Sequence, residues 1–409
     1  MKYINLCFLI ILVSFFLPSI DPIFINLSII SALKYPFVFI GFIVNVVYII
    51  NNGVQIRIDE IYKSIISIVF IFLLSAIFSY DVVITTTRTI SAMLVLFYLL
   101  TYVSIVSDPI IQFEKLGVLI SMFTILTCYY VLVKYDQSLN IAGNFRGIYY
   151  NSNFLGFIIS VVCIPSLYLL FYRIKSSNQA YKHKGVIVSL LIALFYLLII
   201  SKSRSAILTS IIFLLSFYWF YTESKKKYIA NIIALSMVFL IILLTSPEYR
   251  NTTLDYFYKY ESITGDRDIT STRYEIWKTR IDSVSLKPIL GWGYGINPAK
   301  VSNQIQDLGH GDTEKGNSVL ATIEESGLFL GCFILFLYFR VIYINIKALR
   351  RTNSINYVEH AILVSVLIAG FFHTNFESWL FYFGNTVAIF YWLLLVSSRK
   401  YFTKLPQSY

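Results

Sequence analysis

The chain has 409 residues, of which 57% are hydrophobic and only 13% are charged, and its mean hydropathy is +0.71. A soluble domain carries about 25% charged residues, so the composition excludes a soluble globule and predicts an all-α, polytopic integral membrane protein. The formal net charge of +11 would suggest nucleic acid in a soluble chain. In a membrane protein it first reflects cytoplasmic loops, so no nucleic-acid partner is expected.

Apolar segments long enough to cross about 30 Å of hydrocarbon recur along the chain. We predict about twelve transmembrane helices on this criterion. Their ranges are 3–20, 25–50, 61–79, 83–106, 116–135, 153–173, 185–201, 205–221, 229–246, 317–345, 358–373 and 379–397.

Basic residues fall mainly on alternate loops, for example between Arg173 and Lys184 and between Arg399 and Lys404. Loops rich in Lys and Arg stay on the cytoplasmic side, so both termini are expected in the cytoplasm. This orientation places one long hydrophilic segment, 247–316, on the external face. We predict a single polytopic domain over 1–409, with 247–316 as an external loop subdomain that contains short helices.

Two positively charged motifs lie on the predicted external face. The segment Ser-Lys-Ser-Arg-Ser at 201–205 joins two apolar helices with almost no loop. Its cations, Lys202 and Arg204, stand beside hydroxyls that suit an anion, which favours a phosphate-binding corner; the alternative is that they snorkel to lipid headgroups. Arg146, ahead of the helix at 153–173, carries paired donors that could clamp a phosphate or a sugar.

The long loop contains a predicted helix at 272–286. Thr272 followed by Glu275 is a capping-box pattern, and the Lys-Pro pair at 287–288 is a helix stop. An apolar stripe of Trp277, Ile281 and Val284 could rest in lipid or protein at the membrane surface.

Two arginines of this predicted helix are candidate ligands for a diphosphate. Arg273 and Arg280 are seven residues apart, so they lie on nearly the same face, about 10 Å apart along the axis. Either could reach a lipid-borne diphosphate, or either could be an ordinary solvated charge.

Four residues on the same side are candidate general bases: Glu324, Glu325, Glu377 and His310. The three glutamates adjoin apolar helices, where burial raises the pKa of a carboxyl group. Each could therefore act as a base, or could pair with one of the arginines.

Other motifs carry weaker signals. Asp266-Arg267-Asp268 has the spacing of an acidic metal-binding pair but is isolated, so no metal or cofactor is expected. The glycine-rich run at 291–295 does not follow a strand in a βαβ unit, which argues against nucleotide binding. Gly327 and Gly331 form a G-x-x-x-G pair that predicts close helix packing.

Taken in order, several short motifs between about 140 and 335 resemble the O-antigen ligase and polymerase superfamily of bacterial envelope proteins. They are Arg146-Gly147 with Asn153-Phe154-Leu155-Gly156, then Ser201-Lys202-Ser203-Arg204-Ser205-Ala206, then Arg273 to Trp277 with Pro288-Ile289-Leu290-Gly291-Trp292-Gly293, and finally Asn317-Ser318 with Glu325-Ser326-Gly327.

The resemblance implies a metal-independent glycosyltransferase of the bacterial inner membrane that takes its glycan from undecaprenyl diphosphate. In such enzymes arginines hold the diphosphate, which here indicates Arg204, Arg273 and Arg280. Fixed cations would stabilise the negative charge that develops on the departing diphosphate, and a base would accept the proton of the acceptor hydroxyl.

One departure separates the two branches of the superfamily. Ligase-type members usually carry a His-Asn pair where this chain has Gly316-Asn317. The sequence therefore favours an O-antigen polymerase of lipopolysaccharide biosynthesis, with lipid-linked oligosaccharide as both donor and acceptor and room for a chain-length regulator as partner.

The alternatives are an O-antigen ligase that transfers glycan to lipid A core, and a twelve-helix transporter or flippase of lipid-linked glycan. A transporter would place polar residues near the middle of several helices, whereas the charges here gather on the external face.

Overall fold

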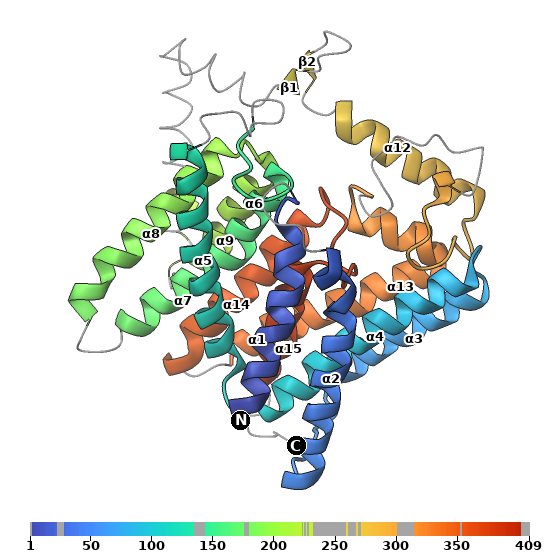
Figure 1. Ribbon diagram of the computed structural model, residues 1–409, viewed down its shortest axis with the longest axis horizontal. Helices are drawn as coiled ribbons and strands as arrows, with labels where there is room; N and C mark the ends of the chain where they lie inside the picture. The colour runs from blue at the N-terminus through green and yellow to red at the C-terminus, as the bar shows by residue number, and fades with distance from the viewer. Residues whose placement is uncertain are drawn as a thin grey trace.

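The structure is a computed structural model, and all statements below concern the residues it describes. These are 2–22, 28–134, 144–175, 180–222, 224, 226, 229–231, 259–260, 267–268, 271–300, 315–351 and 354–401. Within these ranges the fold is helical apart from one short antiparallel pair, β1 (Lys259–Tyr260) and β2 (Arg267–Asp268) (Figure 1).

Most helices run between the two ends of one bundle (Figure 1). In the first half of the chain they are α1 (Lys2–Phe16), α2 (Ser28–Asn52), α3 (Glu60–Ile77), α4 (Val82–Ile105), α5 (Pro109–Lys134), α6 (Ser152–Ile158) and α7 (Ile164–Lys175), the last two joined through a π-helical turn, η2 (Ile159–Cys163). In the second half they are α8 (Ala180–Ile200), α9 (Arg204–Tyr221), α12 (Ser271–Leu286), α13 (Ser318–Leu349), α14 (Ser354–His373) and α15 (Thr386–Ser397). Short 3-10 turns are η1 (Leu17–Ser19), η3 (Pro298–Lys300) and η4 (Ser398–Tyr401).

The prediction of an all-α polytopic membrane protein is confirmed. In the described part of the chain seven helices are long and apolar enough to cross a membrane, and three shorter apolar helices accompany them. Each predicted span overlaps helical residues, although most of the span 229–246 lies outside the described residues.

Two predicted helix starts were wrong. The span predicted from 116 begins at Pro109, because Asp108 accepts a hydrogen bond from Ile111 N (3.2 Å) and proline fits the first helical position. The span predicted from 379 begins only at Thr386, because Asn385 caps it through Val387 N (2.8 Å) and the residues before it form turns. Neither boundary can be located from hydropathy, because the residues around both of them are largely apolar.

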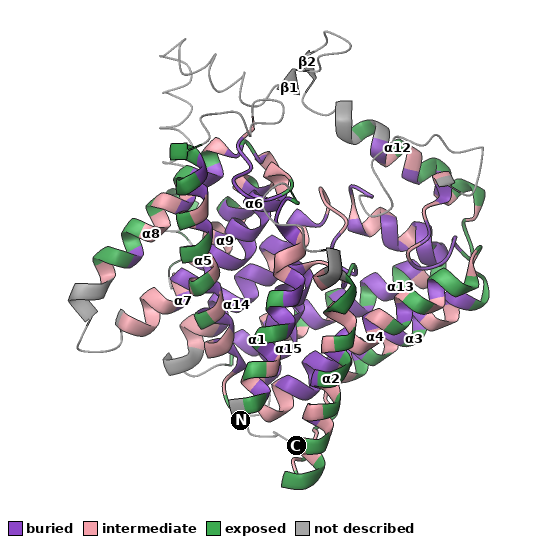
Figure 2. Ribbon diagram, viewed as in Figure 1, coloured by how far each residue is buried: buried purple, intermediate pink, exposed green. Residues whose placement is uncertain are grey.

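The centre of the bundle is the apolar helix α15, all of whose residues are buried (Figure 2). It contacts α1, α4, α5 and α14. By contrast, the outer helices expose large apolar side chains such as Tyr129, Ile192 and Phe70. A soluble monomer rarely shows so much apolar surface, so these faces are the lipid-contacting faces of a membrane protein.

The two ends of the bundle differ in content. At one end, here called the terminal end, Arg399 Nε bonds Asp59 Oδ2 and Lys400 Nζ bonds Asp108 Oδ2, both at 2.6 Å, so η4 is held against the chain just before α3 and α5. The opposite end, called the loop end, carries α12 and the first turns of α4, α6, α9 and α13 (Figure 1).

Candidate active site at the loop end

Helix α13 is broken near its start. Asn317 caps it by accepting from Val319 N (2.8 Å) and Leu320 N (3.0 Å). The helix then breaks at Gly327, whose φ of 78° and ψ of 168° are non-helical. A Cβ at Gly327 would lie 2.0 Å from the carbonyl oxygen of Ile289, so glycine is required for both conformation and space.

The break provides backbone groups for the loop that follows α12. Trp292 N donates to the carbonyl of Glu324 (3.0 Å), and Gly293 N donates to the carbonyl of Glu325 (2.8 Å). These are carbonyls that an unbroken helix would use internally. The glycine-rich run at 291–295 therefore docks on α13 and does not bind a nucleotide through a βαβ unit.

The G-x-x-x-G pair does not mark packing between two helices. Gly327 contacts the loop, and a Cβ at Gly331 would lie 2.9 Å from Cα of Ile323 in the same helix. The two glycines allow α13 to bend sharply and to accept the loop.

Four charged side chains meet at the break. Arg280 Nη1 lies 3.0 Å and 3.2 Å from the two carboxylate oxygens of Glu324. Lys315 Nζ lies 2.9 Å from Glu324 Oε2, 2.8 Å from Glu325 Oε1 and 2.6 Å from the carbonyl of Ile296. We call Arg280, Lys315, Glu324 and Glu325 the ion cluster.

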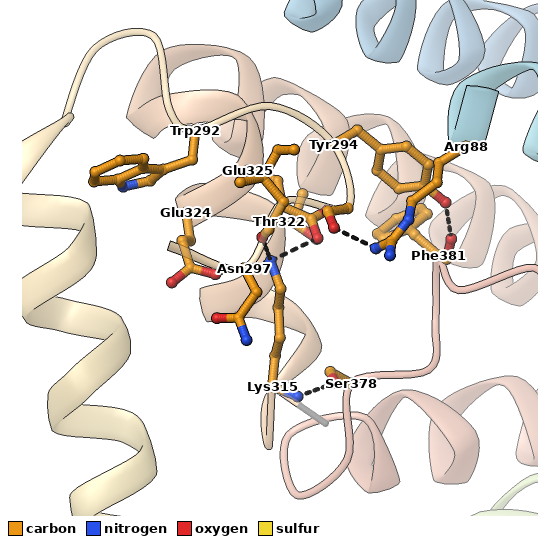
Figure 3. Close-up of polar contacts among 12 residues, drawn as sticks. Arg88, Trp292, Tyr294, Asn297, Lys315, Thr322, Glu324, Glu325, Ser378 and Phe381 are labelled. Carbon is orange, nitrogen blue, oxygen red and sulfur yellow. Dashed lines mark hydrogen bonds and ion pairs between the residues drawn. The ribbon is translucent and has the colours of Figure 1, made fainter. Parts of the chain in front are cut away.

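The ion cluster is buried and balanced: it has two positive and two negative residues, and no residue of the four is more than 8% exposed. Figure 3 shows Lys315 extended from its loop toward Glu325, with Glu324 and Asn297 beside it. Charges removed from water are stable only when paired and hydrogen-bonded. The buried Nε of Arg280 has no hydrogen-bond partner among the described residues, so this donor stays available in the cluster.

The predicted helix at 272–286 is α12 (Ser271–Leu286), but its predicted apolar stripe is not the buried face. Ile276, Arg280 and Ser283 are buried, whereas Ile281 is 56% exposed. The charged Arg280 faces protein because Glu324 of α13 neutralises and bonds it, which periodicity cannot show.

A turn after α14 joins three parts of the site. Asn153 Nδ2, at the start of α6, donates to Glu377 Oε1 (3.0 Å). Ser318, at the start of α13, donates through Oγ to the carbonyl of Glu377 (3.1 Å) and through its backbone N to the carbonyl of Thr374 (2.7 Å). Lys315 N donates to Ser378 Oγ (2.8 Å).

Gly316, where the superfamily resemblance expects histidine, lies at this junction. Its carbonyl accepts from Trp277 Nε1 of α12 (3.3 Å). His373, the last residue of α14, directly precedes the turn. It is buried, stacks on Phe157 with ring centroids 4.5 Å apart, and accepts a hydrogen bond from Trp379 Nε1 (3.0 Å). A histidine therefore stands next to the turn, although it comes from α14.

The remaining predicted cations have distinct environments. Arg146 is buried, paired with Asp21, and donates to the carbonyl of Tyr150 (3.0 Å), so it holds the chain before α6 against the chain after α1. Lys202 is exposed, with a left-handed φ of 50°, and Arg204 is half-buried at the first turn of α9.

The corner that carries Arg204 packs closely on α6. A Cβ at Gly156 would lie 2.6 Å from Cβ of Ser203 and 2.8 Å from Cβ of Ala206. The structure thus brings together two motifs that the sequence separates by about fifty residues. Of the other predicted site residues, His310 and the side chain of Arg273 lie outside the described residues.

Sequence reasoning missed Lys315, and it placed Asn153 in a family motif without assigning it a role in the site. Lys315 ends a hydrophilic run and looks like an ordinary solvated charge. Its partners lie across a helix break that only the conformation of Gly327 reveals. The sequence signal that could have found it is the pair of glutamates followed by Ser-Gly at 324–327, since two adjacent carboxylates inside an apolar helix require buried cations.

The fold and site define a multi-pass, all-helical membrane protein with a buried ionic site at one end. Residues 188–336 match the family model described as O-antigen ligase. The matched segment is less than half of the chain. This segment contains most of α8, all of α9 and α12, and the broken start of α13, so it includes the whole ion cluster.

A curated protein is also similar to this chain. The ComP-specific O-oligosaccharyltransferase of Acinetobacter baylyi (strain ATCC 33305 / BD413 / ADP1) is 28% identical over 195 residues, covering 44% of this chain and 34% of that protein. The chain thus matches about a third of the length of this curated relative. The expected resemblance is supported at the level of the superfamily, and the activity in the relative's name is closer to that of a ligase than to that of a polymerase.

Proposed function

We propose that this protein is a glycosyltransferase of the O-antigen ligase type, which moves an oligosaccharide from undecaprenyl diphosphate to an acceptor hydroxyl at the outer face of the bacterial inner membrane. The observation that carries the proposal is the family match over 188–336, because the same segment supplies Arg204, Arg280 and both glutamates of the ion cluster. The loop end is then the external end, and both termini are cytoplasmic.

In this proposal the cations act on the leaving group. The acceptor oxygen attacks the anomeric carbon of the donor sugar, the bond from that carbon to the diphosphate oxygen breaks, and undecaprenyl diphosphate leaves with the bonding electrons. Arg204, Arg273 and Arg280, with Lys202 at the rim, would stabilise the charge that develops on the diphosphate. No metal ion is required for this step.

The acceptor proton requires a base, and we assign it to Glu377. Both oxygens of Glu324 are bonded to cations, and Glu325 is bonded to Lys315, so these carboxylates serve the ion cluster. Glu377 is half-buried and lies beside the start of α13, where the chain has Gly316. A carboxylate held by Asn153 is oriented to accept a proton.

A second candidate is an O-antigen polymerase, in which the acceptor is the next lipid-linked repeat unit. Gly316 in place of the ligase histidine favours it. The two functions share donor and chemistry and differ only in the acceptor.

The test is reconstitution of the purified chain in liposomes with an undecaprenyl-diphosphate-linked oligosaccharide donor. Lipid A core, a second donor molecule and a protein acceptor with exposed hydroxyls are offered separately as acceptors. A ligase-type enzyme gives one glycan addition to core or protein, and a polymerase gives a ladder of lipid-linked products. Absence of glycan transfer to every acceptor, with the donor intact, would overturn both assignments.

A further inference from the structure

The turn that follows α12 exposes apolar side chains where a soluble loop would expose polar ones. Leu286, Ile289 and Leu290 are 43%, 72% and 44% exposed, respectively. Pro288 between them is exposed as well. Since the turn belongs to a hydrophilic segment of the chain, this apolar tip requires an explanation.

The apolar tip is continuous with an exposed face of α13. Leu328 N donates to the carbonyl of Pro288 (2.7 Å), and the carbonyl of Ile289 contacts Gly327. The next residue of α13, Phe329, is 78% exposed. Phe333 and Phe336 follow on the same face. Because α13 is a candidate membrane span over Ser318–Leu349, this row of aromatic side chains contacts lipid.

The backbone of the turn is suited to the edge of the hydrocarbon. Irregular backbone is tolerated there only when protein groups bond its N–H and C=O groups. Gly291 N donates to the carbonyl of Lys287 (3.1 Å), Trp292 N bonds to α13, and the Pro288 carbonyl accepts from Leu328.

The cation of the turn, Lys287, is also covered. Its ammonium lies 4.5 Å from the ring centroid of Trp292 and 5.4 Å from that of Tyr80. Aromatic faces attract a cation, and Trp and Tyr are the side chains that membrane interfaces prefer.

We propose that the turn at 286–290 inserts into the lipid leaflet at the loop end and anchors α12 along the membrane surface. We expect lipid acyl chains to cover this surface, because the apolar tip extends the lipid-contacting face of α13. Arg280, on the buried face, is thereby held close to the plane of the headgroups. This inference concerns lipid contact and does not depend on glycosyl transfer.

The experiment places a nitroxide label at Ile289→Cys in the full chain, with Cys7→Ser and Cys332→Ser removing the accessible native thiols. The buried thiols of Cys128 and Cys163 remain. The protein is reconstituted in nanodiscs of phosphatidylethanolamine and phosphatidylglycerol, and collisions of the label with oxygen and with a water-soluble nickel chelate are measured.

Two labelled positions calibrate the result: Phe329→Cys for lipid and Lys278→Cys, exposed on α12, for water. The proposal expects oxygen to dominate at 289 as at 329, and the nickel chelate to dominate at 278. Leu290→Cys should agree with 289. A nickel-dominated signal at 289 and 290 overturns the proposal, and low collision with both reagents, which marks a protein neighbour, overturns it as well.

Discussion

Lys315 joins three parts of the ion cluster and its surroundings through one side chain. Its ammonium donates to Glu325 and to the carbonyl of Ile296, and it forms an ion pair with Glu324. It therefore ties the end of the long loop to the part of α13 that precedes the break and to the loop after α12. A lysine can make these three contacts from one nitrogen atom.

Replacing this cation should destabilise the fold. Lys315→Met leaves a buried negative charge uncompensated, which costs about 3–5 kcal/mol. The free energy of unfolding, measured by denaturation in mixed micelles, should fall by that amount. Lys278→Met, which changes an exposed lysine of α12, is the matched control and should change it by less than about 0.5 kcal/mol. Equal effects of the two variants would show that the ion cluster adds nothing to stability.

The assignment of Glu377 as the base can be tested by replacing its carboxylate with an amide. Glu377→Gln keeps the shape and the contact with Asn153 but removes the proton acceptor, so kcat for glycan transfer should fall about 10²–10⁴-fold with donor binding unchanged. Glu60→Gln, an exposed carboxylate at the terminal end, is the control and should retain full activity. If Glu377→Gln keeps more than half of the parent kcat, the base lies elsewhere.

At the scale of the element, the broken helix α13 organises the loop end. Its two parts share one glycine, and the freed carbonyls of Glu324 and Glu325 become acceptors for the loop after α12. The same two residues contribute their carboxylates to the ion cluster. Backbone and side-chain functions therefore coincide at one turn, so a change in the break affects loop and charge together.

Gly327→Ala should be severely destabilising. The new Cβ would lie 2.0 Å from the carbonyl oxygen of Ile289 at a φ of 78°, so backbone strain alone costs about 1–3 kcal/mol. Gly185→Ala is the matched control, because nothing lies within 4 Å of its Cβ position in α8. That change should stabilise the chain by about 0.5–1 kcal/mol. Mixed-micelle unfolding compares the two, and a tolerated Gly327→Ala would mean that α13 is not broken.

At the scale of the whole molecule, the charges divide between the two ends. The terminal end carries ion pairs that hold η4, including Arg399 with Asp59. The loop end carries the ion cluster and the exposed Lys202. The proposed function requires the loop end to be external, because lipid-linked glycan is assembled into surface polysaccharide there.

Orientation can be measured in intact cells with a membrane-impermeant maleimide. A cysteine at Lys278, in the background lacking Cys7 and Cys332, should react, because α12 would face the periplasm. A cysteine at Lys63, 60% exposed at the terminal end, should react only after the inner membrane is opened. The reverse pattern would place the candidate site in the cytoplasm and remove the proposed function.

Hydropathy alone determined that this chain crosses a membrane many times, and local capping patterns located α12, because both properties reside in consecutive residues. The short motifs also indicated a glycan-transferring superfamily, which the family match supports. The partners of those motifs could not be deduced: Arg280 with Glu324, Glu377 with Asn153, and Arg146 with Asp21 join residues 44 to 224 positions apart. Only the tertiary structure decides such pairs, because buried charges take whichever neutralising group the packing brings within reach.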